Sequence, residues 1–365
     1  MPIDGDVAPG FMPLLKKIGG EVETGELRGV QVYVSRAGGE LLNAGVGWSR
    51  GAVAMRRDTV THWLCCTKSL VAVLIAQLEE QGRLDVDQPV ARYWPEFAVN
   101  GKSSITLRGL LTHTSGILGD PAEEYLFCSS QRVAHAIEQC HMDSSAEALG
   151  HSRYIHFSGW AALAEIIRRV TGVPVGLRLK QSVFEPLGML SSHLGLPLPR
   201  GAEYDDTVSR LHIKTRGSPT ECSFLNWPET AAYDWPGFAG RGPASELARA
   251  LESLLGFGPP ILGRAARERF TLPSRGRLYD DNLQDEVDWG LGFKTSSSFF
   301  GCRALTDRVW GHTGLGSSFF VVLPDFDVVA VWVSNVISPP PVHRARIRRV
   351  MATLLDCLQL QGRST

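Results

Sequence analysis

The sequence predicts an α/β fold of the α+β kind, in which an antiparallel sheet built from both termini is flanked by helices and a mostly helical middle segment. Two observations indicate this: residues 29–48 and 317–335 show strand patterns, and helical periodicity dominates much of the chain between them. The pattern predicts a sheet domain of residues 1–85 with 236–365 and an inserted domain of residues 86–235. We expect the active site in the cleft between them.

The strand signals differ at the two ends of the chain. In residues 30–35 valines alternate with other residues, and two glycines at 38–39 supply a turn before a second run, which indicates an antiparallel hairpin. Near the C-terminus, SSFFVVLPDFDVVAVWVSN contains two apolar, β-rich runs around a Pro-Asp-Phe-Asp turn.

Helical periodicity is clearest in residues 67–82, where apolar residues recur along one face and Gly82 stands where a helix C-cap belongs. The same reasoning predicts helices near residues 132–140, 159–171, 244–257 and 344–360.

The composition narrows the class of protein. The chain has 365 residues, of which 44% are hydrophobic and 21% charged, as in soluble globular proteins. A formal net charge of -1 gives no global field for nucleic acid or an anionic membrane surface. No run approaches the ~18 apolar residues of a membrane span. The N-terminus is unlike a secretory signal and the seven cysteines are scattered, so we expect a cytoplasmic protein with reduced thiols.

Cys65 is the first candidate for chemistry. The stretch WLCCTKS places it at the start of the predicted helix, with Lys68 one turn later on the same face. A helix N-terminus and a neighbouring lysine both favour a thiolate. By itself, however, a cysteine in such a place is more often a small apolar residue of the core.

Two further stretches carry reactive side chains. RYIHFSG places Tyr154 and His156 two residues apart before a helix, and WGHTGLGSSFF places His312, Thr313 and Gly314 at the head of a glycine-rich turn. Each of these stretches alone is a weak signal.

Together the three stretches resemble the serine β-lactamase and penicillin-binding-protein superfamily. The closest branch is the class C-like one, which includes D-amino-acid peptidases, family VIII esterases and acyltransferases. The likeness covers about residues 29–355, because ITLRGLLTHTSGI, FEPLGMLSSHLGL, WGLGF and VVAVWVSN also match segments typical of the family. The resemblance implies a β-lactamase-like fold that needs no cofactor or metal.

The family's motifs imply a role for each candidate residue. The S-x-x-K motif falls on Cys65 and Lys68, so cysteine replaces the nucleophilic serine and Cys66 is a bystander. The Y-x-N motif keeps Tyr154 but has His156 in place of asparagine. The third motif, K/H-T/S-G, falls on His312, Thr313 and Gly314 in its histidine form. The family's oxyanion hole would be made by the backbone N–H groups of Cys65 and Leu315.

The histidines leave alternatives open. His156 either acts as an acid or base beside Cys65 or only replaces the hydrogen bonds of asparagine. His312 is expected to anchor substrate or act electrostatically at the cleft edge, with Thr313 and Gly314 binding substrate. The other candidates, His62, His113 and His151, are expected to be structural or surface residues.

The exchange of serine for cysteine bears on the reaction. A thiolate resting beside Lys68 needs no base to activate it, and its acyl form is a thioester, which amines attack readily relative to water. We therefore expect a biosynthetic acyltransferase that moves an acyl group from an ester or thioester donor, small or peptide-like, to an amine or alcohol.

Two other functions remain open at this point. One is an esterase or amidase that hydrolyses the same intermediate, and the other is an inactive binding protein of the same fold. The presence of Lys68, Tyr154 and the H-T-G turn favours an enzyme. The basic run HRARIRR, residues 343–349, is typical of a solvated helix face but would also suit an acidic carrier protein.

Overall fold

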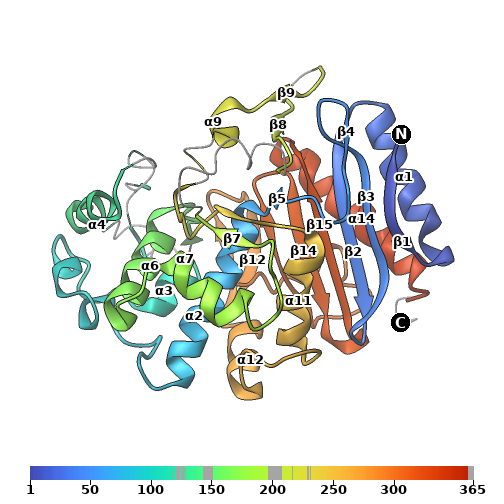
Figure 1. The fold of residues 1–365 in the computed structure, drawn as a ribbon. Helices are drawn as coiled ribbons and strands as arrows, with labels where there is room; N and C mark the ends of the chain where they lie inside the picture. Colours follow the sequence, from blue (N-terminus) through green and yellow to red (C-terminus); the bar gives the residue numbers. More distant parts are fainter. Residues whose placement is uncertain are drawn as a thin grey trace.

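The computed structural model describes residues 1–117, 119–120, 124, 128–142, 151–195, 208–215, 217–227, 230 and 232–360. A twisted antiparallel sheet formed by the two ends of the chain lies beside helices from the middle of the sequence, and both termini lie on the sheet side of the molecule (Figure 1).

The main sheet confirms the prediction that the two ends of the chain share one sheet. Its strand order is β1-β3-β2-β15-β14-β13, with every neighbouring pair antiparallel. The expected N-terminal hairpin is β2 and β3, and β2 pairs with β15 from the C-terminal part. The strands are β1 (Ile3–Val7), β2 (Gly29–Arg36), β3 (Gly39–Arg50), β13 (Trp310–Gly314), β14 (Ser318–Leu323) and β15 (Val328–Ser334).

Both faces of this sheet are covered, which explains why its C-terminal strands read as continuous apolar runs. Alternate residues of β15 enter two different hydrophobic clusters: Val331 and Val333 face one, and Ala330 and Trp332 face the other. The first cluster includes α11 (Ala244–Leu255), and the second includes α1 (Met12–Glu23) and α14 (Pro340–Cys357).

The helix that follows the candidate nucleophile is buried on nearly all sides. In α2 (Thr67–Glu80) every residue from Thr67 to Leu78 is buried, as expected of a helix inside the core of a large domain. It packs against α6 (Ser158–Thr171), α7 (Val175–Leu179) and α12 (Arg264–Thr271). The predicted helices at 67–82, 132–140, 159–171, 244–257 and 344–360 correspond to α2, α4 (Ser130–Gln139), α6, α11 and α14.

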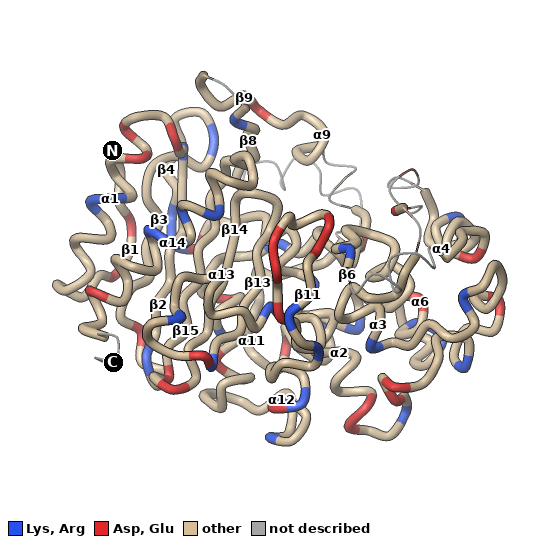
Figure 2. Tube along the Cα trace, turned by 180° about the vertical axis from the view of Figure 1, so that it is seen from behind, with Lys and Arg blue, Asp and Glu red and all other residues tan. Residues whose placement is uncertain are grey.

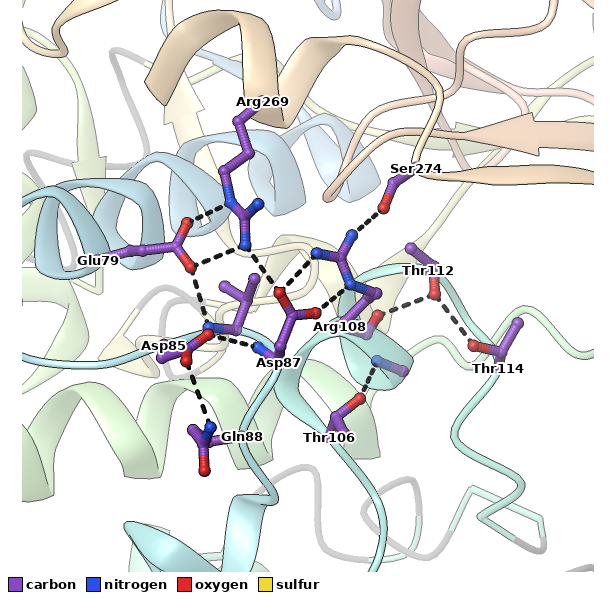
Figure 3. Close-up of polar contacts among 12 residues, drawn as sticks. Glu79, Asp85, Asp87, Gln88, Thr106, Arg108, Thr112, Thr114, Arg269 and Ser274 are labelled. Carbon is purple, nitrogen blue, oxygen red and sulfur yellow. Dashed lines mark hydrogen bonds and ion pairs between the residues drawn. The ribbon is translucent and has the colours of Figure 1, made fainter. Parts of the chain in front are cut away.

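An ion-pair network holds the far end of α2 (Figure 3). Arg269 of α12 donates to Glu79 at 2.8 Å and to Asp87 at 2.9 Å, and Asp87 also accepts from Arg108 of α3 (Leu107–Leu111). Arg108 in turn donates to Ser274. The network thus links three helices at the surface end of α2.

Charges of both signs are interspersed along the visible trace (Figure 2). In the described part of the chain, no helix combines the length and apolar character needed to cross a membrane. The division into two domains stays a prediction.

Glu21 and two arginines join the first and last helices. The buried guanidinium of Arg346, 1% exposed, donates from Nε to Glu21 at 2.8 Å and from Nη1 to Ser338 at 3.1 Å. Arg349 donates to the same carboxylate at 3.2 Å, but its side chain is 57% exposed.

We therefore expect Glu21→Ala to lower the free energy of unfolding by about 3 kcal/mol, since it leaves a buried guanidinium without its carboxylate. The control Arg349→Ala breaks an exposed pair with the same partner and should cost about 0.5 kcal/mol. Denaturant unfolding of the two variants measures both values, and equal losses would show that burial of Arg346 does not set the cost.

Candidate active site

Cys65 lies in a short 3-10 turn, Leu64–Cys66, that runs directly into α2. Leu64 has a φ of 49°, a left-handed conformation that is rare for a leucine and turns the chain sharply. The side chain of Cys66 enters the core, whereas Cys65 lines two cavities and Leu64 lines the smaller of them. The turn thus presents one of the two adjacent cysteines to a ligand and buries the other.

The pKa values of the two thiols are shifted in opposite directions. Burial raises the pKa of the Cys65 thiol, but attraction to Lys68 and polar interactions with His156 and Tyr154 outweigh it, so the pKa falls to about 6. Burial raises the pKa of Cys66 to about 12, and its sulfur lies 3.5 Å from Ser318 Oγ. At neutral pH Cys65 is therefore a thiolate and Cys66 a thiol.

Lys68 is the counter-charge of this thiolate. Its buried Nζ donates to the carbonyl of Gly237 at 2.6 Å and lies 5.5 Å from the ring centroid of Tyr154. Burial lowers the pKa of Lys68, while the negative charge of Cys65 opposes that shift. The ammonium is therefore a better acid than an ordinary lysine, and this helps a proton to leave it.

Tyr154 is held in place by its backbone and by its ring. The backbone N–H donates to Asp280 at 3.0 Å, the carbonyl accepts from Asn282 at 2.6 Å, and the ring stacks on Trp289 at 5.9 Å. Burial, followed by the charge of Cys65, raises the pKa of Tyr154 well above its ordinary value, so the phenol keeps its proton.

His113 packs against the ring of Tyr154, which agrees with the expected structural role. Its ring centroid lies 4.4 Å from that of Tyr154, and its Nδ1 accepts from the N–H of Ile155 at 3.3 Å. Burial lowers the pKa of His113 well below its usual range, and the same holds for the buried His62. The side chain of His151 lies outside the described residues.

His156 stands at the mouth of the site. It is partly exposed, lines both cavities beside Cys65, and its ring lies 4.9 Å from that of Tyr154. This position fits either open alternative, an acid or base beside the thiolate or a donor of hydrogen bonds in place of asparagine.

His312 does not lie at the cleft edge, where the sequence predicts it. Its side chain is 0% exposed, and its Nδ1 accepts from the N–H of Thr313 at 2.9 Å. Burial, and then the charges of Lys294 and Lys68, lowers its pKa well below the ordinary value, so the ring is neutral. Because neighbouring residues of a strand point to opposite faces, His312 packs 6.3 Å from the ring of Tyr154 while Thr313 lines the large cavity.

Gly314 brings β13 against the nucleophile turn. A Cβ on this residue would lie 2.2 Å from Ser318 Oγ, 2.7 Å from the carbonyl of Trp63 and 3.0 Å from the nitrogen of Cys65. In the described part of the chain, the N–H groups of Cys65 and Leu315 have no hydrogen-bond acceptor. Both residues line the two cavities, so these N–H groups stay candidates for the oxyanion hole.

Two cavities meet at Cys65, and both include His156 and Leu315. The smaller, of about 190 Å³, is lined by apolar side chains, among them Phe224, Leu225 and Phe238. The larger, of about 560 Å³, is lined by Tyr154, Thr313, Lys294 and other polar and apolar residues. The sulfur therefore lies between an apolar compartment and a wider, more polar one.

Three residues that support the site were missed from the sequence. Lys294 lines the large cavity and donates to Thr313 Oγ1 at 2.9 Å; burial lowers its pKa to about 8. Asp280 positions Tyr154, and Asp120 accepts from the N–H groups of Phe157 and Ser158 at the start of α6. The run WGLGFK could have drawn attention to Lys294, but neither aspartate belongs to a recognisable motif.

Comparison with known proteins settles the family. A family model described as Beta-lactamase matches residues 15–355. The chain belongs to this family. Esterase/beta-lactamase LipL of Mycobacterium tuberculosis is 31% identical over 159 residues, which cover 41% of this chain and only 35% of LipL.

Solved structures of similar proteins give the same fold. A penicillin-binding-protein homologue from Caulobacter crescentus superposes with a TM-score of 0.81 at 25% identity, covering 97% of this chain and 100% of the other. EstCE1, described as a hydrolase with promiscuous acyltransferase activity, has a TM-score of 0.78 at 17% identity and covers 93% and 98%. This β-lactamase-family chain therefore has the expected fold.

The pKa of Cys65 can be measured by alkylation. We expect the rate of iodoacetamide adduct formation at Cys65 to rise with pH around a midpoint near 6, because only the thiolate reacts. Lys68→Met removes the attraction that lowers the pKa, so its midpoint should rise by about one unit or more. Peptide mass spectrometry over pH 4 to 10 measures the alkylation rate in the wild type and in Lys68→Met. The Cys65→Ala variant shows how much of the alkylation occurs at Cys66. A wild-type midpoint near the ordinary ~8.5 would contradict the thiolate–ammonium pair.

Proposed function

We propose that this protein is an acyl-transfer enzyme that carries its acyl group as a thioester on Cys65. The observation that supports this best is the position of the Cys65 thiol, which lines two cavities and interacts with the side chains of Lys68 and Tyr154. These neighbours, with His156, lower the pKa of the thiol to about 6. The preferred reaction is transfer from an ester or thioester to an amine or alcohol.

In the first half of the reaction, the Cys65 thiolate attacks the carbonyl carbon of the donor. The negative charge moves to the carbonyl oxygen, where the N–H groups of Cys65 and Leu315 can each stabilise it by about 3 kcal/mol. The oxyanion then collapses, the carbon–sulfur bond remains and the bond to the leaving group breaks. A proton from the Lys68 ammonium reaches the departing oxygen or sulfur through the Tyr154 hydroxyl, and leaves Lys68 neutral.

In the second half, the neutral Lys68 amine recovers a proton from the acceptor through Tyr154. The acceptor oxygen or nitrogen attacks the thioester carbon, and Cys65 departs as a thiolate. The cycle returns to the thiolate–ammonium pair without a net change of protons. His156 can assist either half as an acid or base, or it can hold the donor by a hydrogen bond.

The two cavities suggest where each part of the donor binds. An acyl chain attached to Cys65 would be most stable in the apolar compartment of Phe224, Leu225 and Phe238. There its apolar surface is removed from water, which lowers the free energy of the bound state. The leaving group, and later the acceptor, would then use the larger cavity. Water in that cavity in place of an acceptor would make the enzyme an esterase, which is the second candidate function. The promiscuous acyltransferase activity described for the hydrolase EstCE1 fits this kinship of the two reactions.

A carrier-protein donor is not part of this proposal. The arginine cluster that suggests one in the sequence is largely paired within the chain: Arg344 donates to Asp285 at 3.0 Å, and Arg346 and Arg349 both donate to Glu21. We expect a small donor and a small acceptor.

The covalent step can be tested with activated esters and thioesters. Intact-protein mass spectrometry should show one acyl adduct that maps to Cys65 and is absent in Cys65→Ala. Tyr154→Phe should lower turnover by about two orders of magnitude, as expected of a group that relays protons, with an unchanged melting temperature. Product analysis with and without an added amine separates transfer from hydrolysis. If wild-type protein exposed to these esters and thioesters carries no acyl group on Cys65, the proposal is wrong. If Tyr154→Phe turns over at the normal rate, the tyrosine has no part in the mechanism.

The acyl compartment predicts a dependence on chain length. An apolar cavity of ~150 Å³ holds a benzene molecule, so about 190 Å³ should accept straight chains of roughly six to eight carbons. We expect kcat/KM for 4-nitrophenyl esters to rise to that length and then fall. Leu225→Ala should move the optimum by about two carbons, whereas Ile213→Ala, on the wall of the large cavity, should not. A flat profile, or an equal shift in both variants, would place the acyl chain elsewhere.

A further inference from the structure

Lys294 is a buried cation without a carboxylate partner in the described part of the chain. Its side chain is 1% exposed, and its Nζ makes one hydrogen bond, to Thr313 Oγ1 at 2.9 Å. The ring of Phe299 lies 4.1 Å below the ammonium. The ring of Trp289 lies 5.7 Å from the same ammonium. One neutral acceptor and two aromatic faces compensate only part of the cost of removing an ammonium from water, so the site favours an additional anion.

The backbone fixes where this ammonium lies. Lys294 exchanges both backbone hydrogen bonds with Gly311 of β13, each at 2.8 Å, which places its side chain alongside that of Thr313. Both residues line the 560 Å³ cavity together with Cys65 and Tyr154. A strand-like pairing, rather than a loop, therefore positions the charge in the compartment next to the nucleophile.

The other cations on this cavity wall are already paired. Lys214 donates to Glu26 at 2.7 Å, and Arg344 donates to Asp285 at 3.0 Å. No aspartate or glutamate is among the described residues that line the cavity. Asp280 and Cys65 attract Lys294 through space, but in the described part of the chain neither accepts a hydrogen bond from its ammonium. Lys294 is thus the cation among the described lining residues that has no carboxylate bonded to it.

We infer that Lys294 binds an anionic group, a carboxylate or a phosphate, on the alcohol or thiol portion of the acyl donor. The inference rests on the proposed function, since the thioester chemistry and the apolar acyl compartment assign the large cavity to the leaving group. An ammonium is a compact charge with three donors, and two of the three on Lys294 remain for the anion. The substrate class is therefore an ester or thioester with an apolar acid at one end and an anion at the other.

Matched substrate pairs test the anion and its source. For carboxylate, the pair is 4-nitrophenyl hexanoate and 3-carboxy-4-nitrophenyl hexanoate. For phosphate, the pair is the hexanoyl thioester of pantetheine and that of 4′-phosphopantetheine. The measured quantity is the ratio of kcat/KM for the anionic over the neutral member, corrected for the intrinsic reactivity of each ester with a free thiol. We expect a ratio of about ten or more in at least one pair, mostly through KM.

The variants separate charge from packing. Lys294→Met keeps a long side chain over Phe299 but has no ammonium, so the ratio should fall to about one. Lys294→Arg should keep most of it, and Lys214→Met, which removes the already paired lysine, should leave it unchanged. A wild-type ratio of one in both pairs, or a ratio that survives in Lys294→Met, overturns the inference.

Calorimetry in the Cys65→Ala background separates this inference from the proposed function. The intact anionic ester should bind to Cys65→Ala and lose about tenfold in affinity when Lys294→Met is added. If this loss appears although no ester acylates the wild-type protein, the anion site stands and the proposed reaction falls. If acylation occurs but the double variant binds as tightly as Cys65→Ala, the reaction stands and Lys294 is not the anchor.

Discussion

The site depends on one interaction, the buried pair formed by the Cys65 thiolate and the Lys68 ammonium. Neither charge would persist alone in this environment, because burial raises the pKa of the thiol and lowers that of the amine. Each therefore stabilises the charged state of the other, and removing one would neutralise its partner. The thiolate form of Cys65 is a property of the pair rather than of the cysteine alone.

The surrounding fold keeps the Lys68 ammonium out of water and fixes its position beside Cys65, which lines the two cavities. Lys68 belongs to a helix that is buried on nearly all sides, and its ammonium is tied to Gly237. Tyr154 is held by Asp280, by the stacked ring of Trp289 and by the tilted rings of the buried, neutral His113 and His312. Charged imidazoles there would repel Lys68, so their neutrality is itself a condition for the pair.

The sequence predicted the features that depend on local patterns. The alternation at residues 30–35 identified β2, and the apolar periodicity identified α2. The motif spacing singles out Cys65 and Lys68, whose side chains interact in the structure, and their catalytic roles stay a prediction. What it missed depends on pairing between distant segments. Lys294 reaches the site through its ladder with Gly311, and His312 is buried because strand alternation exposes Thr313 instead. A motif shows which residue types are present but not which face of the strand they occupy.

In the proposed reaction, the choice between transfer and hydrolysis would depend on the same geometry. After the first half-reaction, the apolar compartment would still hold the acyl chain and the large cavity would be vacant. A thioester reacts intrinsically with amines faster than with water, but water is far more concentrated, so the acceptor must be enriched beside the thioester. A buried cation that bound the first leaving group would also attract an acceptor bearing a similar anion. The residue that selects the donor would then favour transfer over hydrolysis, because donor and acceptor occupy the same cavity in turn.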